Sequence, residues 1–174
     1  MRGLFFLLLV ACHSTPPPPT LGAFPDFTLT DQSGRTVHVA DLRGQPWVAD
    51  FIFTRCGDVC PRLTEQMARL RKDTGARAVS FSVDPDYDTP AVLTEYAAAH
   101  HADWTFLTGP IDAVADGAKL ALQRDPTKPA PVSILHGSHF ILVDAAGKIR
   151  GYYDPSDEEA SARLRADLRA LERK

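Results

Sequence analysis

The stretch from Trp47 to Phe53, WVADFIF, constrains the fold of this chain more than any other. It is a nearly continuous apolar run with the length of a β-strand. A strand of this kind is covered on both faces, whereas a strand with one solvated face alternates between apolar and polar residues. We therefore expect this strand to lie near the centre of a sheet.

Strand and helix signals follow one another along the rest of the chain. Alternating residues at 27–30 and 36–39, joined by the turn 31–34, predict an N-terminal hairpin. Spaced apolar residues and N-caps predict four helices, which begin at Cys60, run from Thr89-Pro90 to about His101, cover 110–122 and begin at a capping box at Ser156. Apolar runs predict strands at 76–84 and 104–109. A proline-rich loop is expected at 123–133, and a hairpin of 139–144 with 148–154. This order predicts a thioredoxin-like α/β fold, with a central mixed sheet flanked by helices.

Length and charge narrow the class of protein further. The chain has 174 residues and 44% hydrophobic residues, which suits one domain around one core. Its formal net charge of −3 gives no basic surface of the kind that binds nucleic acid. We expect no nucleic-acid partner.

The N-terminus, MRGLFFLLLVACHS, has the pattern of an export signal. Its apolar run covers only about 10 Å as a helix, against roughly 30 Å of hydrocarbon in a bilayer. Residues 9–12, LVAC, resemble the lipobox of bacterial lipoproteins, which implies lipidation at Cys12 and an exported protein anchored to a bacterial membrane, with its domain in the periplasm or otherwise outside the cytoplasmic membrane. A signal peptide cut nearby without lipidation is the alternative.

These features divide the chain into three parts. Residues 1–11 are expected to be the lipoprotein signal peptide. Residues 12–23 contain four consecutive prolines and are expected to form an extended tether. Residues 24–174 are expected to form the thioredoxin-like domain.

Cys56 and Cys60 are separated by three residues and lie where the central strand passes into its helix. A stabilising disulfide is one interpretation, but closing so short a loop restricts the unfolded chain very little. A helix N-terminus lowers a cysteine pKa, so we expect both thiols to be activated, with Asp58 as the N-cap. Redox chemistry and metal binding both remain open.

The three-residue spacing favours a metal over a disulfide only by degree. Disulfide sulfurs are about 2.05 Å apart, whereas two thiolates on one metal are on the order of 4 Å apart. A neutral imidazole is the obvious third ligand. His136 and His139 lie near the sheet edge expected to carry the cysteines, and strand alternation would point them to opposite faces, so we expect one of the two to reach the site. The other histidines are expected to be exposed: His13, His38, His100 and His101.

FTRCGDVCP at 53–61, with LHGSHF at 135–140, resembles the Sco/SenC family of copper proteins, and FSVDPDYDTP at 81–90 is also similar. The resemblance implies a copper site, Cu(I) or Cu(II), with Cys56, Cys60 and His136 as ligands. It also implies a metallochaperone for the dinuclear copper centre of cytochrome c oxidase, whose copper-bearing subunit would be the partner. Soft thiolates favour Cu(I), in agreement with this ligand set.

One position departs from the family pattern. The family usually has proline after the first cysteine, where this chain has Gly57. We expect a more flexible loop, with weaker metal binding or easier disulfide closure.

Other functions remain as alternatives. The main one is an exported thiol-disulfide oxidoreductase that uses Cys56 and Cys60 as a redox-active pair, on the oxidase copper site or other targets. A peroxidase fits the sequence less well. Asp84, Asp86 and Asp88 form only part of a calcium loop, so we expect a solvated turn or a partner-docking surface there. We expect a metal chaperone more than an enzyme.

Overall fold

The computed structural model describes residues 16–110, 123–124, 134–135 and 138–173. Its helices are a short 3-10 helix η1 (Val39–Leu42), α1 (Val59–Thr74), α2 (Pro90–Ala99) and α4 (Glu158–Glu172). Its strands are β1 (Gly22–Ala23), β2 (Thr28–Asp31), β3 (Thr36–His38), β4 (Trp47–Ile52), β5 (Arg77–Ser82), β6 (Thr105–Thr108), β7 (Gln123–Arg124), β8 (Ile134–Leu135), β9 (Phe140–Val143) and β10 (Lys148–Tyr153).

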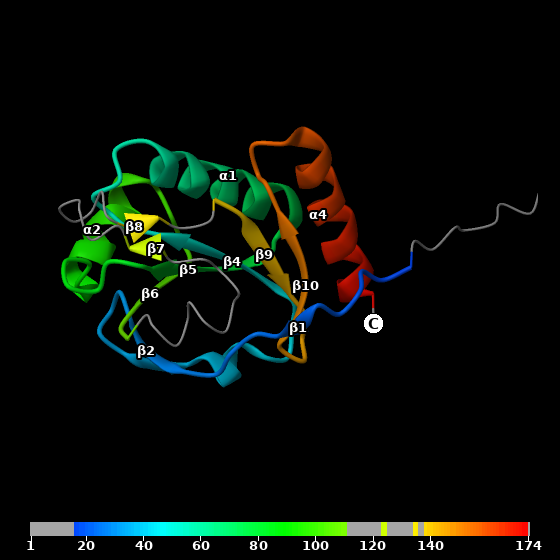
Figure 1. Cartoon of the computed structure of the whole chain (residues 1–174), viewed down its shortest axis with the longest axis horizontal. Coiled ribbons are helices and arrows are strands. Elements are labelled where there is room, and N and C mark those ends of the chain that lie inside the picture. Colours follow the sequence, from blue (N-terminus) through cyan, green and yellow to red (C-terminus); the bar gives the residue numbers. More distant parts are fainter. Residues whose placement is uncertain (1–15, 111–122, 125–133, 136–137, 174) are drawn as a thin grey trace, which may run out of the picture.

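The main sheet is mixed and runs in the order β1-β10-β9-β4-β5-β6-β2-β3. The neighbours β4, β5 and β6 are parallel, and the outer pairs are antiparallel. Helices α1 and α4 lie side by side against the sheet, and α2 packs near β6 (Figure 1). This arrangement confirms the predicted thioredoxin-like α/β fold.

Strand β4 is the centre of the core. Each of its six residues is buried, as the apolar run predicted. The Phe51 ring stacks on Phe81 of β5 with centroids 5.2 Å apart. Helix α1 covers the sheet with Leu63, Met67 and Leu70, which are all buried.

Most of the predicted elements are confirmed. The hairpins β2–β3 and β9–β10 are present, and Thr89 caps α2 by accepting a hydrogen bond from the Val92 N–H. The N-cap of α4 is Asp157 and not Ser156, because the Asp157 side chain accepts from the backbone N–H groups of the first turn.

Two predictions, the loop at 123–133 and the helix at 110–122, concern the region before β9. The loop predicted for 123–133 is wrong at Gln123–Arg124, which pair with Ile134–Leu135 as β7 and β8. The rest of that loop, and the helix predicted for 110–122 apart from Pro110, lie outside the described residues.

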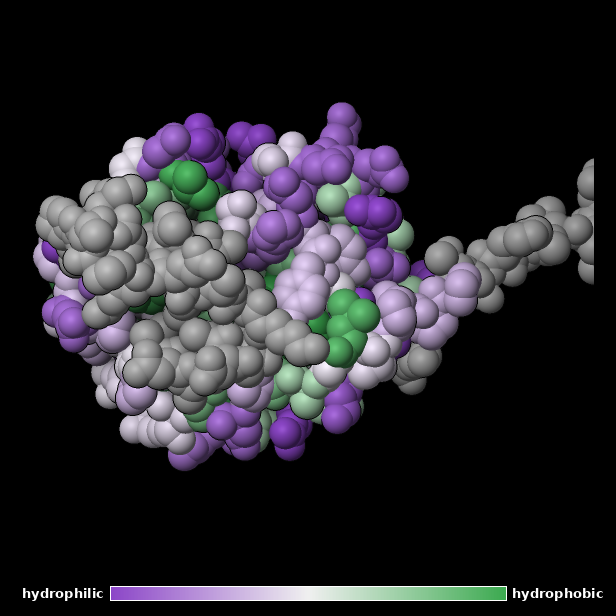
Figure 2. Space-filling view, in the orientation of Figure 1, coloured by the Kyte–Doolittle hydropathy of each residue, from purple (hydrophilic) through white to green (hydrophobic). Residues whose placement is uncertain are grey.

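Few large apolar side chains are exposed among the described residues. On the face shown in Figure 2, hydrophilic side chains predominate and hydrophobic residues form small separate groups. In the described part of the chain, the large apolar side chains that are exposed are Leu21, Val59, Tyr87 and Tyr152. Among the helices of these same residues, none is long and apolar enough to cross a membrane.

Asp50 is a charged residue in the middle of β4. It is 0% exposed, and neither of its carboxylate oxygens has a hydrogen-bond partner among the described residues. Burial raises the pKa of Asp50 to about 7. The folded protein therefore holds a proton here that the unfolded chain releases near pH 4.

Stability should therefore fall as pH rises from about 4 to about 7, because the folded state binds the extra proton in that window. We expect Asp50→Asn to remove this dependence and to be more stable than the wild type at pH 8 by roughly 1–4 kcal/mol, with little difference at pH 4.5. Urea unfolding at both pH values measures this. The control is Asp31→Asn, which should lose stability at pH 8 because the pKa of Asp31 is lowered in the folded state. Equal effects of Asp50→Asn at both pH values would contradict the expectation.

Candidate metal centre

The two cysteines meet at the carboxyl end of β4. Cys56 lies in the loop after the strand, and Cys60 lies in the first turn of α1, which begins at Val59. Asp58 is the N-cap residue as predicted, but its side chain makes no capping hydrogen bond. It forms an ion pair with Arg62 at 2.9 Å instead. In open α/β sheets this edge is where ligands bind.

The two thiols differ in environment. Both are thiols and not a disulfide, and the Cys60 N–H points to the Cys56 sulfur at 3.4 Å. Cys56 is partly exposed, and although burial opposes it, hydrogen bonds from the backbone of Asp58, Val59 and Cys60 lower its pKa. Cys60 is 0% exposed, and burial raises its pKa well above the usual range. The prediction that both thiols are activated is therefore wrong for Cys60.

A short chain of hydrogen bonds supports the first turn of α1. The Thr64 hydroxyl donates to the Cys60 carbonyl at 3.0 Å and lies 3.0 Å from the Tyr96 hydroxyl of α2. Both side chains are buried. This contact ties α2 to the helix turn that carries Cys60.

The predicted histidine ligand, His136, lies outside the described residues. Its competitor His139 is exposed and lies just before β9, which begins at Phe140, so the strand alternation does not include His139. His38 and His101 are exposed as expected, whereas His100 is half-buried with its ring 4.3 Å from Tyr96.

The described residues on their own do not complete a metal site. Within them, no three His, Cys, Asp or Glu side chains are grouped so as to hold a metal ion. A third ligand to the dithiol would therefore come from outside the described residues or from a bound partner.

A cavity of about 220 Å³ opens next to the first turn of α1. Val59 and Leu63 line one side of it. Ser138, two residues after His136, lines another side. The segment that precedes β9 therefore reaches the helix turn that carries Cys60.

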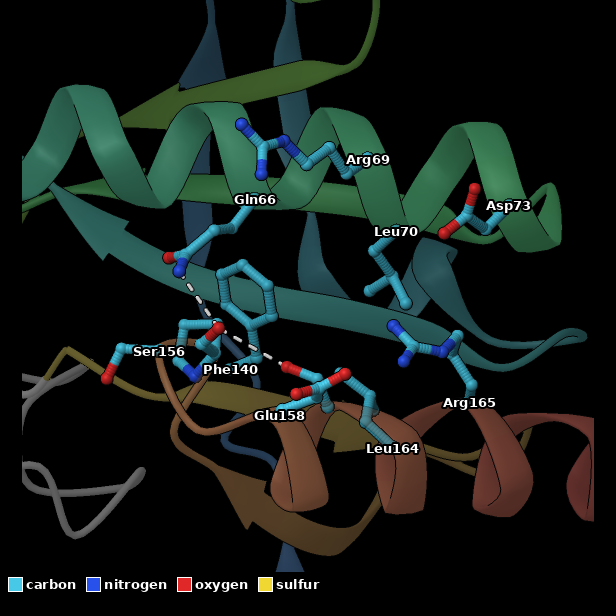
Figure 3. A pocket seen from close by; sticks show the side chains of 11 residues that line it. Gln66, Arg69, Leu70, Asp73, Phe140, Ser156, Glu158, Leu164 and Arg165 are labelled. Atoms are coloured by element: carbon cyan, nitrogen blue, oxygen red, sulfur yellow. Dashed lines mark hydrogen bonds between the residues drawn. The ribbon is translucent and has the colours of Figure 1, made fainter.

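A larger cavity of about 340 Å³ lies between α1 and α4. Figure 3 shows Gln66 of α1 pointing across it, where its amide donates to the Pro155 carbonyl at 2.9 Å. Arg69 and Arg165 face it from the two helices. No cysteine or histidine is among its described lining residues, so it offers no soft metal ligand.

The aspartates after β5 are not a solvated turn. Asp84 and Asp88 are 3% and 0% exposed, and only Asp86 is exposed. Both buried carboxylates accept hydrogen bonds from the residues just before Cys56. No local pattern predicts these contacts, because the partners are 29 and 34 positions away along the chain.

Gly57 has no conformational need to be glycine. Its φ is not in the left-handed region, and a Cβ at this position would meet nothing within 4 Å. A side chain, as in the family pattern, would therefore fit here.

The fold and the cysteines define a class of protein, a thioredoxin-like domain with a thiol pair at the carboxyl edge of its sheet. The sequence matches the SCO1/SenC family model over residues 17–171. It is also 36% identical over 165 residues to a SCO1 protein homolog of Bacillus subtilis. This alignment covers 87% of this chain and 84% of the relative. The chain belongs to the SCO1/SenC family.

Solved structures agree with this assignment. A SCO1/SenC family lipoprotein from Bacillus anthracis has a TM-score of 0.79 at 30% identity, over 90% of this chain and 99% of that one. Copper-bound ScoI from Bradyrhizobium japonicum has a TM-score of 0.73 at 28% identity, over 86% of this chain and 99% of that one. BsSco, a member of the Sco family of cytochrome c oxidase assembly proteins in which a disulfide switch was identified, has a TM-score of 0.76 at 30% identity, over 90% and 97%.

The difference between the thiols predicts selective alkylation. In the reduced native protein we expect iodoacetamide to modify Cys56 at least about ten-fold faster than Cys60, because Cys56 is more exposed and its thiolate is more accessible. Peptide mass mapping over time measures both rates, and protein unfolded in urea is the control in which the rates converge. Equal rates in the native protein would contradict the assignment.

Proposed function

We propose that this chain is a copper-binding Sco protein that carries copper for assembly of cytochrome c oxidase. The proposal depends on one observation, the convergence of two thiols in a protein of this family, with the Cys60 N–H 3.4 Å from the Cys56 sulfur. Thiolates are soft ligands that favour Cu(I). The copper-bearing subunit of the oxidase is the proposed recipient, and the description of BsSco as a member of a family of cytochrome c oxidase assembly proteins supports this choice.

Cys56, Cys60 and His136 are the proposed ligands. Ser138 supports a ligand from this segment of the chain, because it lines the cavity beside Val59 and lies two positions after His136. Two residues of chain span at most roughly 7 Å, a distance that a histidine side chain helps to bridge. Copper bound here would displace the thiol protons, and the cost would be greater at Cys60 because burial raises its pKa.

A thiol-disulfide oxidoreductase is the second candidate. The thiol pair favours it through its asymmetry, since Cys56 is partly exposed with a lowered pKa and Cys60 is buried with a raised one. An exposed thiolate can attack a target disulfide, and the buried thiol can then release the mixed disulfide. Both functions would use the same two sulfurs.

A Cu(I) titration of the reduced protein tests the proposal. We expect tight binding of a single copper that is lost in Cys56→Ala and in Cys60→Ala, because each removes a soft ligand. His136→Ala should weaken binding. The matched control is His139→Ala, three residues away and exposed, which should bind as the wild type does.

The same preparation separates the two candidates. If the wild type binds no copper tightly but rapidly reduces a protein disulfide, with a potential near the roughly −270 mV of thioredoxin, the chaperone function fails and the oxidoreductase function stands. If His139→Ala weakens binding and His136→Ala does not, the ligand assignment is wrong.

We further propose that the protein is exported and anchored by lipid at Cys12, with 1–11 as signal peptide and 12–23 as tether. The lipoprotein from Bacillus anthracis supports this by its own description. The end of the tether rests on the domain, where the Arg150 guanidinium donates to the carbonyls of Pro18 and Pro19.

The tether reaches the domain at the end of the sheet opposite the cysteines. Gly22 pairs with Ile149, and both Ile149 and Trp47 are in register with Val143. Trp47 begins β4, whereas Cys56 follows its far end. Residues 12–18 span at most roughly 22 Å, so an anchor at Cys12 would hold the thiol pair on the side of the domain away from the membrane.

Replacing Cys12 tests the anchor. In a bacterial host we expect the wild type to fractionate with membranes and to enter the detergent phase of Triton X-114, whereas Cys12→Ser should become water-soluble because it has lost its acyl chains. Mass spectrometry of the mature N-terminus provides the control. A wild-type protein that is water-soluble and has an unmodified N-terminus would contradict the proposed lipid anchor.

A further inference from the structure

The backbone just before Cys56 is held by a buried carboxylate from another loop. Asp88 is 0% exposed and accepts from the Thr54 hydroxyl at 2.5 Å and from the Thr54 N–H at 3.2 Å. The Ser82 hydroxyl donates at 2.6 Å to Oδ2, the same carboxylate oxygen that accepts from the Thr54 N–H at 3.2 Å. Asp88 therefore joins the loop after β4 to the end of β5.

A second carboxylate holds the next residue. Asp84 is 3% exposed and accepts from the Arg55 guanidinium at 2.6 Å and 3.2 Å. The same guanidinium lies over the Tyr87 ring, 4.1 Å from its centroid. Thr54 and Arg55, the two residues that lead into Cys56, are thus both bound to the 84–88 loop.

The 84–88 loop is itself well fixed. The N–H groups of Tyr87 and Asp88 both donate to the Asp84 carbonyl, at 3.0 Å and 2.8 Å. The Asp84 N–H donates to the Ser82 hydroxyl at 3.1 Å. At the other end of the loop, Thr89 is the N-cap residue of α2. The two carboxylates therefore belong to a short turn that is held by Ser82 at one end and by the start of α2 at the other.

The cysteine loop needs such support. The last paired residue of β4 in the sheet is Ile52, opposite Ser82, and α1 begins at Val59. Between them Gly57 adds backbone freedom. Buried carboxylates are costly unless they are hydrogen-bonded, and here Asp88 accepts hydrogen bonds from Thr54, and Asp84 from Arg55, in the chain that leads into Cys56.

We propose that Asp88 and Asp84 are positioning residues, which fix the cysteine loop in the geometry that binds copper. This inference rests on the proposed function. Asp88 acts through Thr54 and Asp84 acts through Arg55, and neither carboxylate is proposed to touch the metal. Residues that orient metal ligands in this way commonly change metal affinity by roughly 10–100-fold when they are replaced.

Release of Cu(I) to a competing chelator tests the inference in the reduced full chain. We expect Asp88→Asn to release copper roughly 10–100-fold faster than the wild type, because asparagine keeps the shape but has one acceptor oxygen for the donors of Thr54 and Ser82. Asp31→Asn is the matched control. Asp31 is 2% exposed and accepts from Ser33 and Arg35 in the β2–β3 turn, and β2 lies three strands from β4.

Variants of Thr54 keep the test decisive if Asp88→Asn folds poorly. Thr54→Val removes the hydroxyl at nearly the same shape and should also speed release, whereas Thr54→Ser keeps the hydroxyl and should release copper at the wild-type rate. Urea unfolding of each apoprotein separates a change at the copper site from a loss of stability, since Asp31→Asn should lower stability without speeding release.

The outcomes distinguish this inference from the proposed function. A wild type that retains copper while Asp88→Asn and Thr54→Val release it at the wild-type rate overturns the inference alone. Faster release from Asp31→Asn in proportion to its lost stability also overturns it, because the effect would then be general. A wild type that binds no Cu(I) overturns the proposed function, and the inference with it.

Discussion

Burial of β4 on both faces is the constraint on which the rest of this molecule depends. All six residues of the strand are buried between β9 and β5, so its position along the sheet is fixed by packing on every side. A shift by one residue would turn every side chain to the opposite face. The loop that carries Cys56 therefore begins from a fixed point, and α1, which carries Cys60, packs back on the same core.

The chemistry of the thiol pair follows from the different environments of the two sulfurs. Cys60 belongs to the core, and Cys56 belongs to the loop, where backbone N–H groups from the start of α1 surround it. One sulfur is thus fixed and protonated in the apoprotein, and the other is accessible and more easily ionised. A metal ion or a target disulfide would meet Cys56 first, so both proposed functions, copper binding and thiol-disulfide exchange, would begin at the same sulfur.

The sequence predicted what local pattern determines. The run at 47–53 predicted a buried strand, the apolar spacing after Cys60 predicted α1, and both agree with the structure. The burial of Asp50 follows from the strand prediction, but the lack of a hydrogen-bond partner for its carboxylate among the described residues could not be predicted from the sequence. Sequence reasoning also missed the contact of Asp88 with Thr54, which depends on how two loops meet in space. Long-range pairings of polar side chains have no periodic signal.

The loop combines restraint at both ends with freedom in the middle. Thr54 and Arg55 are bound to buried carboxylates, and Val59 opens a regular helix, so the freedom added by Gly57 is confined to the few residues between them. A disulfide needs sulfurs about 2.05 Å apart and a shared metal needs on the order of 4 Å, a difference that movement of Cys56 alone can span. Since Cys60 is buried in the core, the balance between a disulfide and a metal-bound pair, as proposed, would depend mainly on how firmly the chain before Cys56 is held.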